Sequence, residues 1–171
     1  MLIFVLAGAM LALVDTLPTE QHRHQVTHLP GAVGGALKET QYAGFLPTGK
    51  DDGHIFYWLF GSRAEWTADT PLLVWLQGGP GASSMTGLMF ENGPFTLQPN
   101  LTLTRNEWSW NTDAHVVYFD QPVGTGFSYC ADRGYVTSER EAAEQLRDVI
   151  VQLLLMHPVI KECPLFLTGE R

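Results

Sequence analysis

Short apolar runs alternate with polar, glycine-rich segments through most of this chain. Residues 42–49 and 54–63 are rich in apolar and aromatic side chains and flank a polar turn at 48–53. Residues 71–77 and 115–119 are apolar almost without a break. Aromatic and β-branched residues favour strands, and uninterrupted apolar runs of this length suit strands covered on both faces. The pattern therefore predicts two strands around a turn, followed by two buried strands.

A helical pattern follows. Ser138 and Glu141 have the spacing of a capping box. Apolar residues then recur at helical spacing, at Leu146, Val149, Ile150, Leu153 and Leu154. His157-Pro158 predicts the end of this helix, and residues 164–169 predict another short buried strand. Strands and a helix in this order indicate an α/β fold with a largely parallel sheet.

The two ends of the apolar pattern differ from its middle. Residues 1–14 are apolar throughout and too short to span a bilayer comfortably, which predicts a signal peptide for the secretory pathway. The alternatives are a buried core segment or a misassigned start, because no Lys or Arg forms the n-region of a signal peptide. Residues 15–40 have no usable periodicity, and we expect a solvated linker there. Its histidines, His22, His24 and His28, lack carboxylate or thiolate company, so we expect no metal site.

Composition narrows the function. The chain has 171 residues, of which 45% are hydrophobic and 11% aromatic, as in a globular domain. Its net charge of −8 argues against nucleic acid as a partner, and no basic patch favours stable membrane association. Asn100-Leu101-Thr102 is a glycosylation sequon, which agrees with secretion. The two cysteines, Cys130 and Cys163, can pair with each other or with partners outside the chain.

Residues 77–81, Gln-Gly-Gly-Pro-Gly, follow a predicted buried strand directly. Two glycines release the backbone from steric limits, so that main-chain N–H groups can converge on a negative charge. That charge is either a phosphate or a reaction oxyanion. No phosphate-binding G-x-x-x-x-G-K-[ST] or G-x-G-x-x-G motif is present, which favours the oxyanion. The alternative is a tight turn that binds nothing.

Four long blocks extend this hypothesis to a family. PLLVWLQGGPGASSMTGLMFENGPF (71–95), WSWNTDAHVVYFDQPVGTGFSY (108–129) and LFLTGE (165–170) together resemble the serine carboxypeptidases. YAGFLPTGKDDGHIFYWLFGSR (42–63) resembles that family's opening hairpin. The resemblance covers about residues 41–170. It implies the N-terminal part of an α/β-hydrolase domain whose Ser-Asp-His triad removes single residues from peptide C-termini.

The resemblance also implies site residues. Gly78 and Gly79 match the family's oxyanion loop, with Gly79 as donor and Gly78 shaping the loop. The free carboxylate of a peptide or protein C-terminus is expected to bind Gln77, Glu91 and Glu170. Three carboxylates in one dry pocket cannot all ionise cheaply, so one should hold a proton. This predicts a preference for acidic pH, as in a vacuole, a lysosome or a secreted setting. No metal or organic cofactor is implied.

Further positions agree with the family or depart from it. Thr86 and Phe90 fall where the family lines the pocket for the departing residue. Gln77 stands where Asn is usual, and its extra methylene is expected to move the amide. Ala82 stands where Cys is often found, so a bridge from this loop is absent.

The last residues depart furthest from the resemblance. A nucleophile elbow is a strand followed by G-x-S-x-G. Here Gly169 and Glu170 are followed by Arg171 where Ser is expected, and no triad Asp or His follows. Arg stays protonated and cannot attack a carbonyl. Residues 1–171 by themselves are therefore predicted to be inactive. The hypotheses are a portion of an active serine carboxypeptidase, a related acyltransferase, or a non-catalytic product that binds peptide C-termini.

Overall fold

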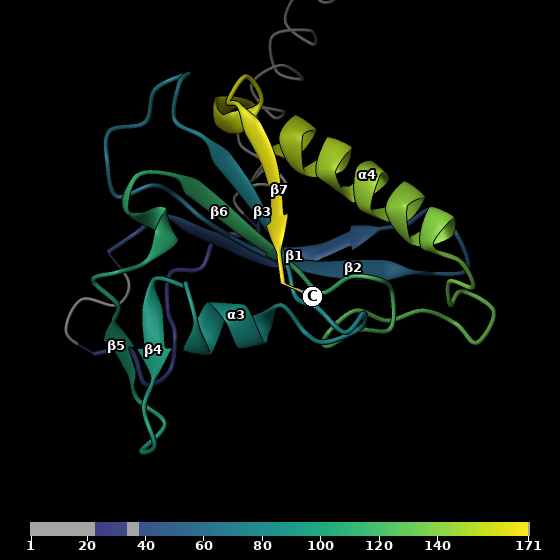
Figure 1. Ribbon diagram of the computed structural model, residues 1–171, viewed down its shortest axis with the longest axis horizontal. Coiled ribbons are helices and arrows are strands. Elements are labelled where there is room, and N and C mark those ends of the chain that lie inside the picture. The colour runs from purple at the N-terminus through teal and green to yellow at the C-terminus, as the bar shows by residue number, and fades with distance from the viewer. Residues whose placement is uncertain (1–22, 34–37, 171) are drawn as a thin grey trace, which may run out of the picture.

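A five-stranded sheet forms the centre of the computed structural model (Figure 1). In spatial order its strands are β1 (Gln41–Pro47), β2 (His54–Phe60), β6 (His115–Phe119), β3 (Leu72–Leu76) and β7 (Leu165–Gly169). All five strands predicted from the sequence are present, but the prediction that the last one is buried is wrong. Leu165, Phe166 and Leu167 of β7 are exposed, because β7 is an edge strand that pairs only with β3. The turn between the first two is closed by a hydrogen bond from Thr48 N–H to the Gly53 carbonyl (2.8 Å).

The structure describes residues 23–33 and 38–170. The predicted signal peptide, His22 and Arg171 lie outside this range. Within it, no helix is long and apolar enough to cross a membrane.

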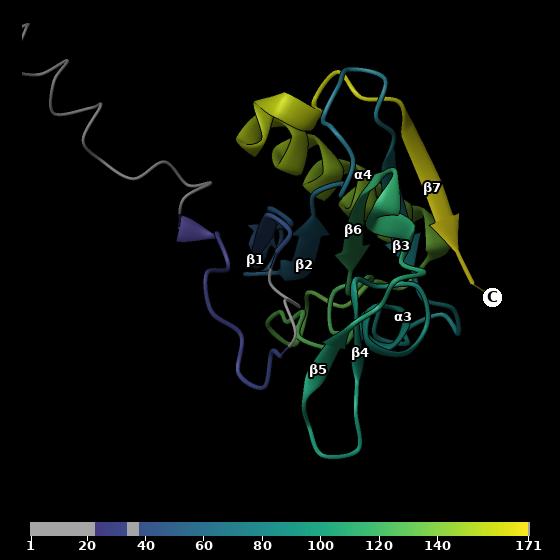
Figure 2. The same ribbon diagram turned by 90° about the vertical axis from the view of Figure 1, so that its left-hand side faces the viewer.

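The strands of the sheet share one direction with a single exception. β6 and β7 both pair with β3 in parallel. β2 runs antiparallel to both of its neighbours, β1 and β6, so β1 points the same way as β6. The sheet is therefore mixed but mostly parallel, as the α/β prediction requires. Its parallel part places the carboxyl ends of β3 and β7 side by side (Figure 2).

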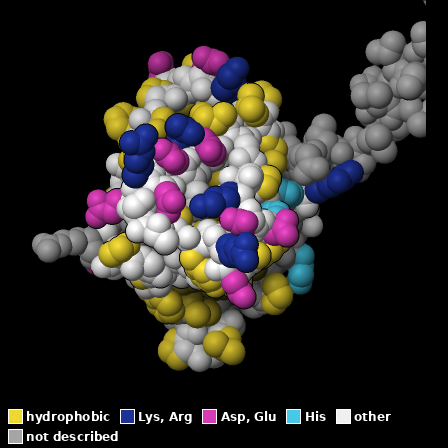
Figure 3. All heavy atoms as spheres, turned by 90° about the vertical axis from the view of Figure 1, so that its right-hand side faces the viewer, with side chains coloured by type: hydrophobic (Ala, Val, Ile, Leu, Met, Phe, Trp, Pro, Cys, Tyr) yellow, Lys and Arg dark blue, Asp and Glu magenta, His cyan; other side chains and the backbone are white. Residues whose placement is uncertain are grey.

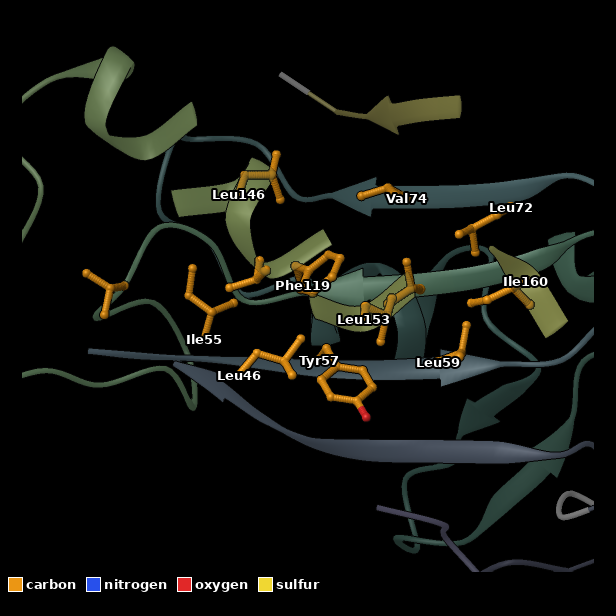
Figure 4. Packing of buried hydrophobic residues seen from close by; sticks show 13 residues of the cluster. Leu46, Ile55, Tyr57, Leu59, Leu72, Val74, Phe119, Leu146, Leu153 and Ile160 are labelled. Carbon is orange, nitrogen blue, oxygen red and sulfur yellow. The ribbon is translucent and has the colours of Figure 1, made fainter. Parts of the chain in front are cut away.

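Both faces of β2, β3 and β6 are covered, which explains their continuous apolar runs. α4 (Glu139–Met156) covers one face, while α3 (Met85–Phe90) and the hairpin of β4 (Phe95–Leu97) and β5 (Leu103–Arg105) cover the other (Figure 1). Alternate residues of each strand point to opposite faces. Figure 4 shows the α4 side, where side chains from strands and helix meet: Leu46, Ile55, Tyr57, Leu59, Leu72, Val74, Phe119, Leu146, Leu153 and Ile160. The opposite cluster contains Trp58, Phe60, Trp75, Met85, Leu88, Phe95, Leu103, Val116 and Tyr118.

The predicted helix is α4, and its caps explain its limits. The Ser138 hydroxyl accepts a hydrogen bond from Glu141 N–H (3.3 Å), as an N-cap does. The Glu141 carboxylate accepts from the backbone of Thr137 rather than closing the capping box on Ser138. The helix ends at Met156, directly before His157-Pro158, where a short 3₁₀ turn begins (Pro158–Ile160). Pro cannot continue the helical hydrogen-bond pattern.

The sequence did not predict α3, β4 or β5. Each has only three to six residues, too few for a periodic pattern to appear. α3 also carries Gly87 in its interior, which lowers helix propensity. Tertiary contacts stabilise it instead, because Met85 and Leu88 pack into the second core cluster.

The expected linker is corrected where the structure describes it. Gln25 forms a bridge to Tyr42 of β1, and Val26 N–H donates to the Gln41 carbonyl (2.9 Å). The ring of His24 hydrogen bonds through Nδ1 to the Tyr57 hydroxyl (2.8 Å). This segment is attached to the edge of the sheet, and His24 is a packing residue rather than a solvated one.

Surface charges are mixed where they can be followed. On the face shown in Figure 3, acidic and basic side chains are interspersed rather than separated by sign. Cys130 and Cys163 are both free thiols that pack beside the core, and burial raises the pKa of Cys163.

Candidate active site

An open groove of about 490 Å³ lies at the carboxyl ends of β3 and β7. Its lining includes Gly78, Gly79, Gln121 and Glu170. In open α/β sheets, ligands bind outside the carboxyl ends of the parallel strands. The groove therefore occupies the position at which this architecture places its chemistry.

Gln77 is the first residue after β3, and its amide connects both candidate glutamates. The side-chain oxygen accepts hydrogen bonds from the Trp75 indole and from the Gly87 backbone N–H, both at 3.0 Å. These two donors fix the orientation of the amide, so its NH₂ group points the other way. Nε2 then donates to Glu91 Oε1 (3.0 Å) and to Glu170 Oε2 (2.7 Å).

The extra methylene of Gln77 does not remove its amide from the site. Its length lets one amide reach α3 through the oxygen and both carboxylates through the nitrogen. Glu91 and Glu170 come from the end of α3 and the end of β7, which are 79 positions apart in sequence. Three candidate residues that the resemblance named are thus in direct contact.

The two glutamates are solvent-exposed, and the charge of Glu91 affects the buried layer below. Burial, and to a smaller extent Glu91, raises the pKa of the Tyr118 hydroxyl, so that group stays protonated. Tyr118 donates its proton to Asn92 Oδ1 (2.9 Å), beside Glu91 in the chain. The segment that carries Glu91 is therefore anchored from inside the core.

The glycine loop (residues 78–84) connects β3 to α3. Gly79 and Gly81 have φ values of +120° and +96°, in the region that side-chain-bearing residues rarely adopt. The backbone N–H groups of Gly78 and Gly79 have no hydrogen-bond partner within the described ranges. Two unpartnered N–H groups beside a groove can donate hydrogen bonds to a bound anion or to a reaction oxyanion.

Thr86 and Phe90 lie one turn apart on the exposed face of α3. The Phe90 side chain is 64% exposed. Neither residue lines the groove, although Glu91, which follows Phe90, binds Gln77. The structure therefore places this pair beside the carboxylate cluster and outside the hollow itself.

Sequence reasoning missed the residues that hold this site from behind. Trp75 orients the Gln77 amide, and Ser84 accepts a hydrogen bond from Gln77 N–H (3.1 Å). Asp120 accepts hydrogen bonds from Ser83 and Ser84. No spacing rule joins Asp120 to Ser83 and Ser84, which are 37 and 36 positions away, and none assigns a role to Trp75, so only the blocks that contain these residues gave a signal.

A second, enclosed cavity lies near the amino ends of the strands. Its volume is about 10 Å³, close to the minimum for one water molecule, and its lining includes His115 and His157. Burial lowers the pKa of each imidazole from 6.5 to about 4, and His24 contributes to the shift at His157. Both Nε2 atoms are buried without a hydrogen-bond partner. Across the described part of the chain, no group of three or more His, Cys, Asp or Glu side chains could hold a metal ion.

The mostly parallel sheet, the helices on both faces and the groove beyond β3 define an α/β-hydrolase fold. A family model described as serine carboxypeptidase matches residues 30–171. The chain therefore belongs to the serine carboxypeptidase family.

Curated relatives agree. The lysosomal protective protein of Mus musculus is 42% identical over 131 residues, covering 76% of this chain and 27% of its own length. The venom serine carboxypeptidase of Apis mellifera is 41% identical over 133 residues, covering 77% of this chain and 28% of its own. The present chain thus spans little more than a quarter of these relatives.

A solved structure gives the same result. The crystal structure of a prohormone-processing carboxypeptidase from Saccharomyces cerevisiae superposes with a TM-score of 0.78 at 27% sequence identity. The match covers 90% of this chain and 36% of that one.

Proposed function

We propose that this chain supplies the substrate-carboxylate site and one oxyanion donor of a serine-type carboxypeptidase that acts on peptide or protein C-termini. The observation that carries the proposal is the Gln77 amide, held between Glu91 and Glu170 beside two unpartnered glycine N–H groups. A free C-terminal carboxylate can take the place of one glutamate on the amide and accept a hydrogen bond from it.

The glycine loop has the second task. During acyl transfer the scissile carbonyl oxygen becomes negative, and the Gly79 N–H is proposed to bind it, with Gly78 shaping the loop. Losing one such donor typically costs about 3 kcal/mol of transition-state stabilisation. Thr86 and Phe90 are proposed to contact the departing residue, because they share the exposed face of α3, the helix that ends just before Glu91.

Charge gives the proposal a pH dependence. A bound substrate carboxylate would be the third beside Glu91 and Glu170, which already share one amide. Like charges so close together favour the uptake of a proton. The protonated glutamate can then donate a hydrogen bond to the substrate. Binding is therefore expected to strengthen as the pH falls toward 5.

The same reasoning extends to the cellular route. The relatives named lysosomal protective protein and venom serine carboxypeptidase favour the secretory pathway, with a lysosomal, vacuolar or extracellular destination.

Asn100 is exposed at the β4–β5 turn, where its side-chain oxygen accepts from Thr102 N–H and from the Thr102 hydroxyl (2.7 Å). We expect Asn100→Gln to lower the apparent mass of the secreted protein to that seen after glycosidase treatment. An unchanged mass would contradict glycosylation there.

The activity is tested with a matched pair of N-blocked dipeptides, one ending in a free carboxylate and one in a carboxamide. The full-length protein that contains this chain, secreted from a eukaryotic host, should release the last residue from the acid and leave the amide intact. Binding of the acid without hydrolysis would favour the non-catalytic alternative. Equal treatment of both peptides, or no interaction with either, would contradict the carboxylate site.

A further inference from the structure

Asp120 is a buried carboxylate in contact with the candidate active site. It follows β6 directly, and its relative exposure is 0%. No Lys, Arg or His in the described part of the chain forms an ion pair with it. A buried charge is stable only where hydrogen bonds replace water, so the donors around Asp120 indicate what it is for.

Three donors surround this carboxylate, and they come from two loops. Oδ1 accepts from the Ser83 hydroxyl (2.6 Å) and from Ser84 N–H (2.9 Å), which close the glycine loop. Oδ2 accepts from Phe127 N–H (2.9 Å) in the turn after β6. A Cβ on Gly126 would lie 2.1 Å from Oδ2 and 2.7 Å from Ser83 Oγ, so this approach requires glycine. The two loops are therefore fastened to each other through one carboxylate.

The contacts continue to the substrate-binding amide. Ser84 is buried, and its hydroxyl donates to the Phe119 carbonyl while accepting from Gln77 N–H (3.1 Å). Asp120 thus fixes Ser84, and Ser84 fixes the backbone of Gln77 at the start of the glycine loop. Asp120 itself does not line the groove, so any effect on substrate passes through the loop.

We propose that Asp120 is a positioning residue for the glycine loop, holding Gly78, Gly79 and Gln77 in the geometry that binds the oxyanion and the substrate carboxylate. The catalytic consequence rests on the proposed carboxypeptidase function, whereas the effect on the loop does not. Charge-assisted hydrogen bonds are stronger than neutral ones and more demanding in geometry. An ionised Asp120 therefore holds the loop more tightly than a neutral amide can.

The test compares Asp120→Asn with Ser128→Ala. Asn keeps the shape but turns one acceptor into a donor, which must face the N–H of Ser84 or Phe127. Ser128 is also buried. Its hydroxyl donates to the Asp120 carbonyl and accepts from Phe56 N–H, so its loss loosens the same corner but removes no hydrogen bond to the glycine loop. Ser83→Ala, which removes one donor from a partly exposed position, serves if Asp120→Asn does not fold.

We expect Asp120→Asn to lower kcat by about 100-fold with a smaller change in KM, because a misplacement near 1 Å costs that much. Ser83→Ala should lower kcat about tenfold, as a weaker form of the same displacement. Ser128→Ala should reduce Tm with kcat within about twofold of wild type. Equal kcat values in Asp120→Asn and wild type, or a parallel loss in Ser128→Ala, would overturn the positioning role.

Hydrogen exchange separates this inference from the proposed activity. The hydrogen-bonded amides of Gln77, Ala82 and Ser84 should exchange about tenfold faster in Asp120→Asn or Ser83→Ala, and at the wild-type rate in Ser128→Ala. If wild type hydrolyses nothing but these rates differ as expected, the carboxypeptidase proposal fails and loop positioning stands. Unchanged exchange in both Asp120→Asn and Ser83→Ala overturns the inference, whatever the activity.

Discussion

The two ends of the parallel strands treat their ionisable groups in opposite ways. At the carboxyl ends, Glu91 and Glu170 are exposed and share the amide of Gln77. At the amino ends, His115 and His157 are 1% and 2% exposed, and each has a buried nitrogen without a partner. The carboxyl ends carry charged side chains that solvent can reach, whereas burial at the amino ends disfavours the charged form of both imidazoles.

The difference matters for a protein proposed to work in acid. Low pH should strengthen substrate binding at the carboxyl ends, because a bound proton reduces the repulsion between the substrate carboxylate and the two glutamates. Acid should weaken the amino end, because the unfolded histidines take up protons below pH 6.5 while the folded ones resist to about pH 4. Activity and stability are thus expected to have opposite pH dependences, set by residues at opposite ends of the same strands.

The largest expected effect is at Gln77. Gln77→Glu keeps the oxygen that Trp75 and Gly87 bind but replaces the NH₂ donor with an oxygen. The site then holds a third carboxylate beside Glu91 and Glu170. We expect kcat/KM for free-carboxylate peptides to fall on the order of 1000-fold at pH 6–7. The loss should be smaller at pH 4.5, where the introduced carboxyl can be protonated.

Gln98→Glu is the matched control. Its amide donates to Thr104 in the β4–β5 hairpin, away from the groove. Steady-state kinetics should show no change for this variant. An equal loss in both variants would mean that added negative charge, rather than the lost donor, explains the effect.

The next prediction concerns the buried histidines. The fall in pKa from 6.5 to about 4 corresponds to about 3 kcal/mol of stability per histidine, present above pH 6.5 and lost as the pH falls toward 4. His157→Phe removes one titrating group, so the fall in Tm from pH 7.5 to pH 4.5 should be smaller in this variant than in wild type by roughly 6–12 °C.

His28 is the control for this measurement because it is exposed. Thermal unfolding of His28→Gln should follow the wild-type pH profile. A parallel profile for His157→Phe and wild type would show that burial of this imidazole does not cause the acid sensitivity. Neither variant should alter kcat at a temperature where both are folded.

A third prediction uses the buried charge of Glu39. Its Oε1 accepts from Arg63 Nε (2.6 Å) and Arg105 Nη1 (2.7 Å), and its side chain is 3% exposed. Glu39→Gln removes the counter-charge that Arg63 and Arg105 share, although Arg105 keeps its ion pair with the exposed Glu107. The substitution should cost about 2–3 kcal/mol in denaturant unfolding. The exposed pair Arg140–Glu144 offers a contrast, since Glu144→Gln should change stability by less than about 0.5 kcal/mol. A loss of activity without a loss of stability in Glu39→Gln would contradict the assignment of Glu39 to stability and of the carboxyl-end groove to activity.

The smallest effect is expected on α3. Phe90 is exposed, so Phe90→Ala should leave Tm nearly unchanged. If Phe90 contacts the departing residue, the preference for a C-terminal Leu over Gly should fall by less than about tenfold, as for one modest apolar contact. Competition between two peptides that differ only in the last residue measures this ratio directly. An unchanged ratio would remove Phe90 from the pocket.

Apolar patterning predicted the central strands β3 and β6 because they are buried on both faces, and its prediction that β7 is buried too was wrong. It predicted α4 because eighteen residues are enough for helical periodicity to appear. It could not predict α3, whose six residues include Gly87 and depend on tertiary packing. Hydrophobic pattern thus accounts for the large elements and fails for those that carry part of the site.

The site itself came from the family resemblance rather than from spacing. Gln77, Glu91 and Glu170 were named as a group, but only the structure shows a single amide between two carboxylates. Asp120 lies within residues 108–129, one of the blocks that resemble the family, but its role does not follow from that block, because its partner Ser83 is 37 positions away. Contacts of this kind depend on how strands are ordered in space, which local sequence does not specify.

Proton uptake on binding tests the central claim most directly. Calorimetric titration of a free-carboxylate peptide into the protein at pH 6, in buffers of different ionisation enthalpy, counts the protons that accompany binding. Three carboxylates around Gln77 predict an uptake of about one proton for the acid and none for the matching amide. Binding of the acid without proton uptake, or with the same uptake as the amide, would contradict the account.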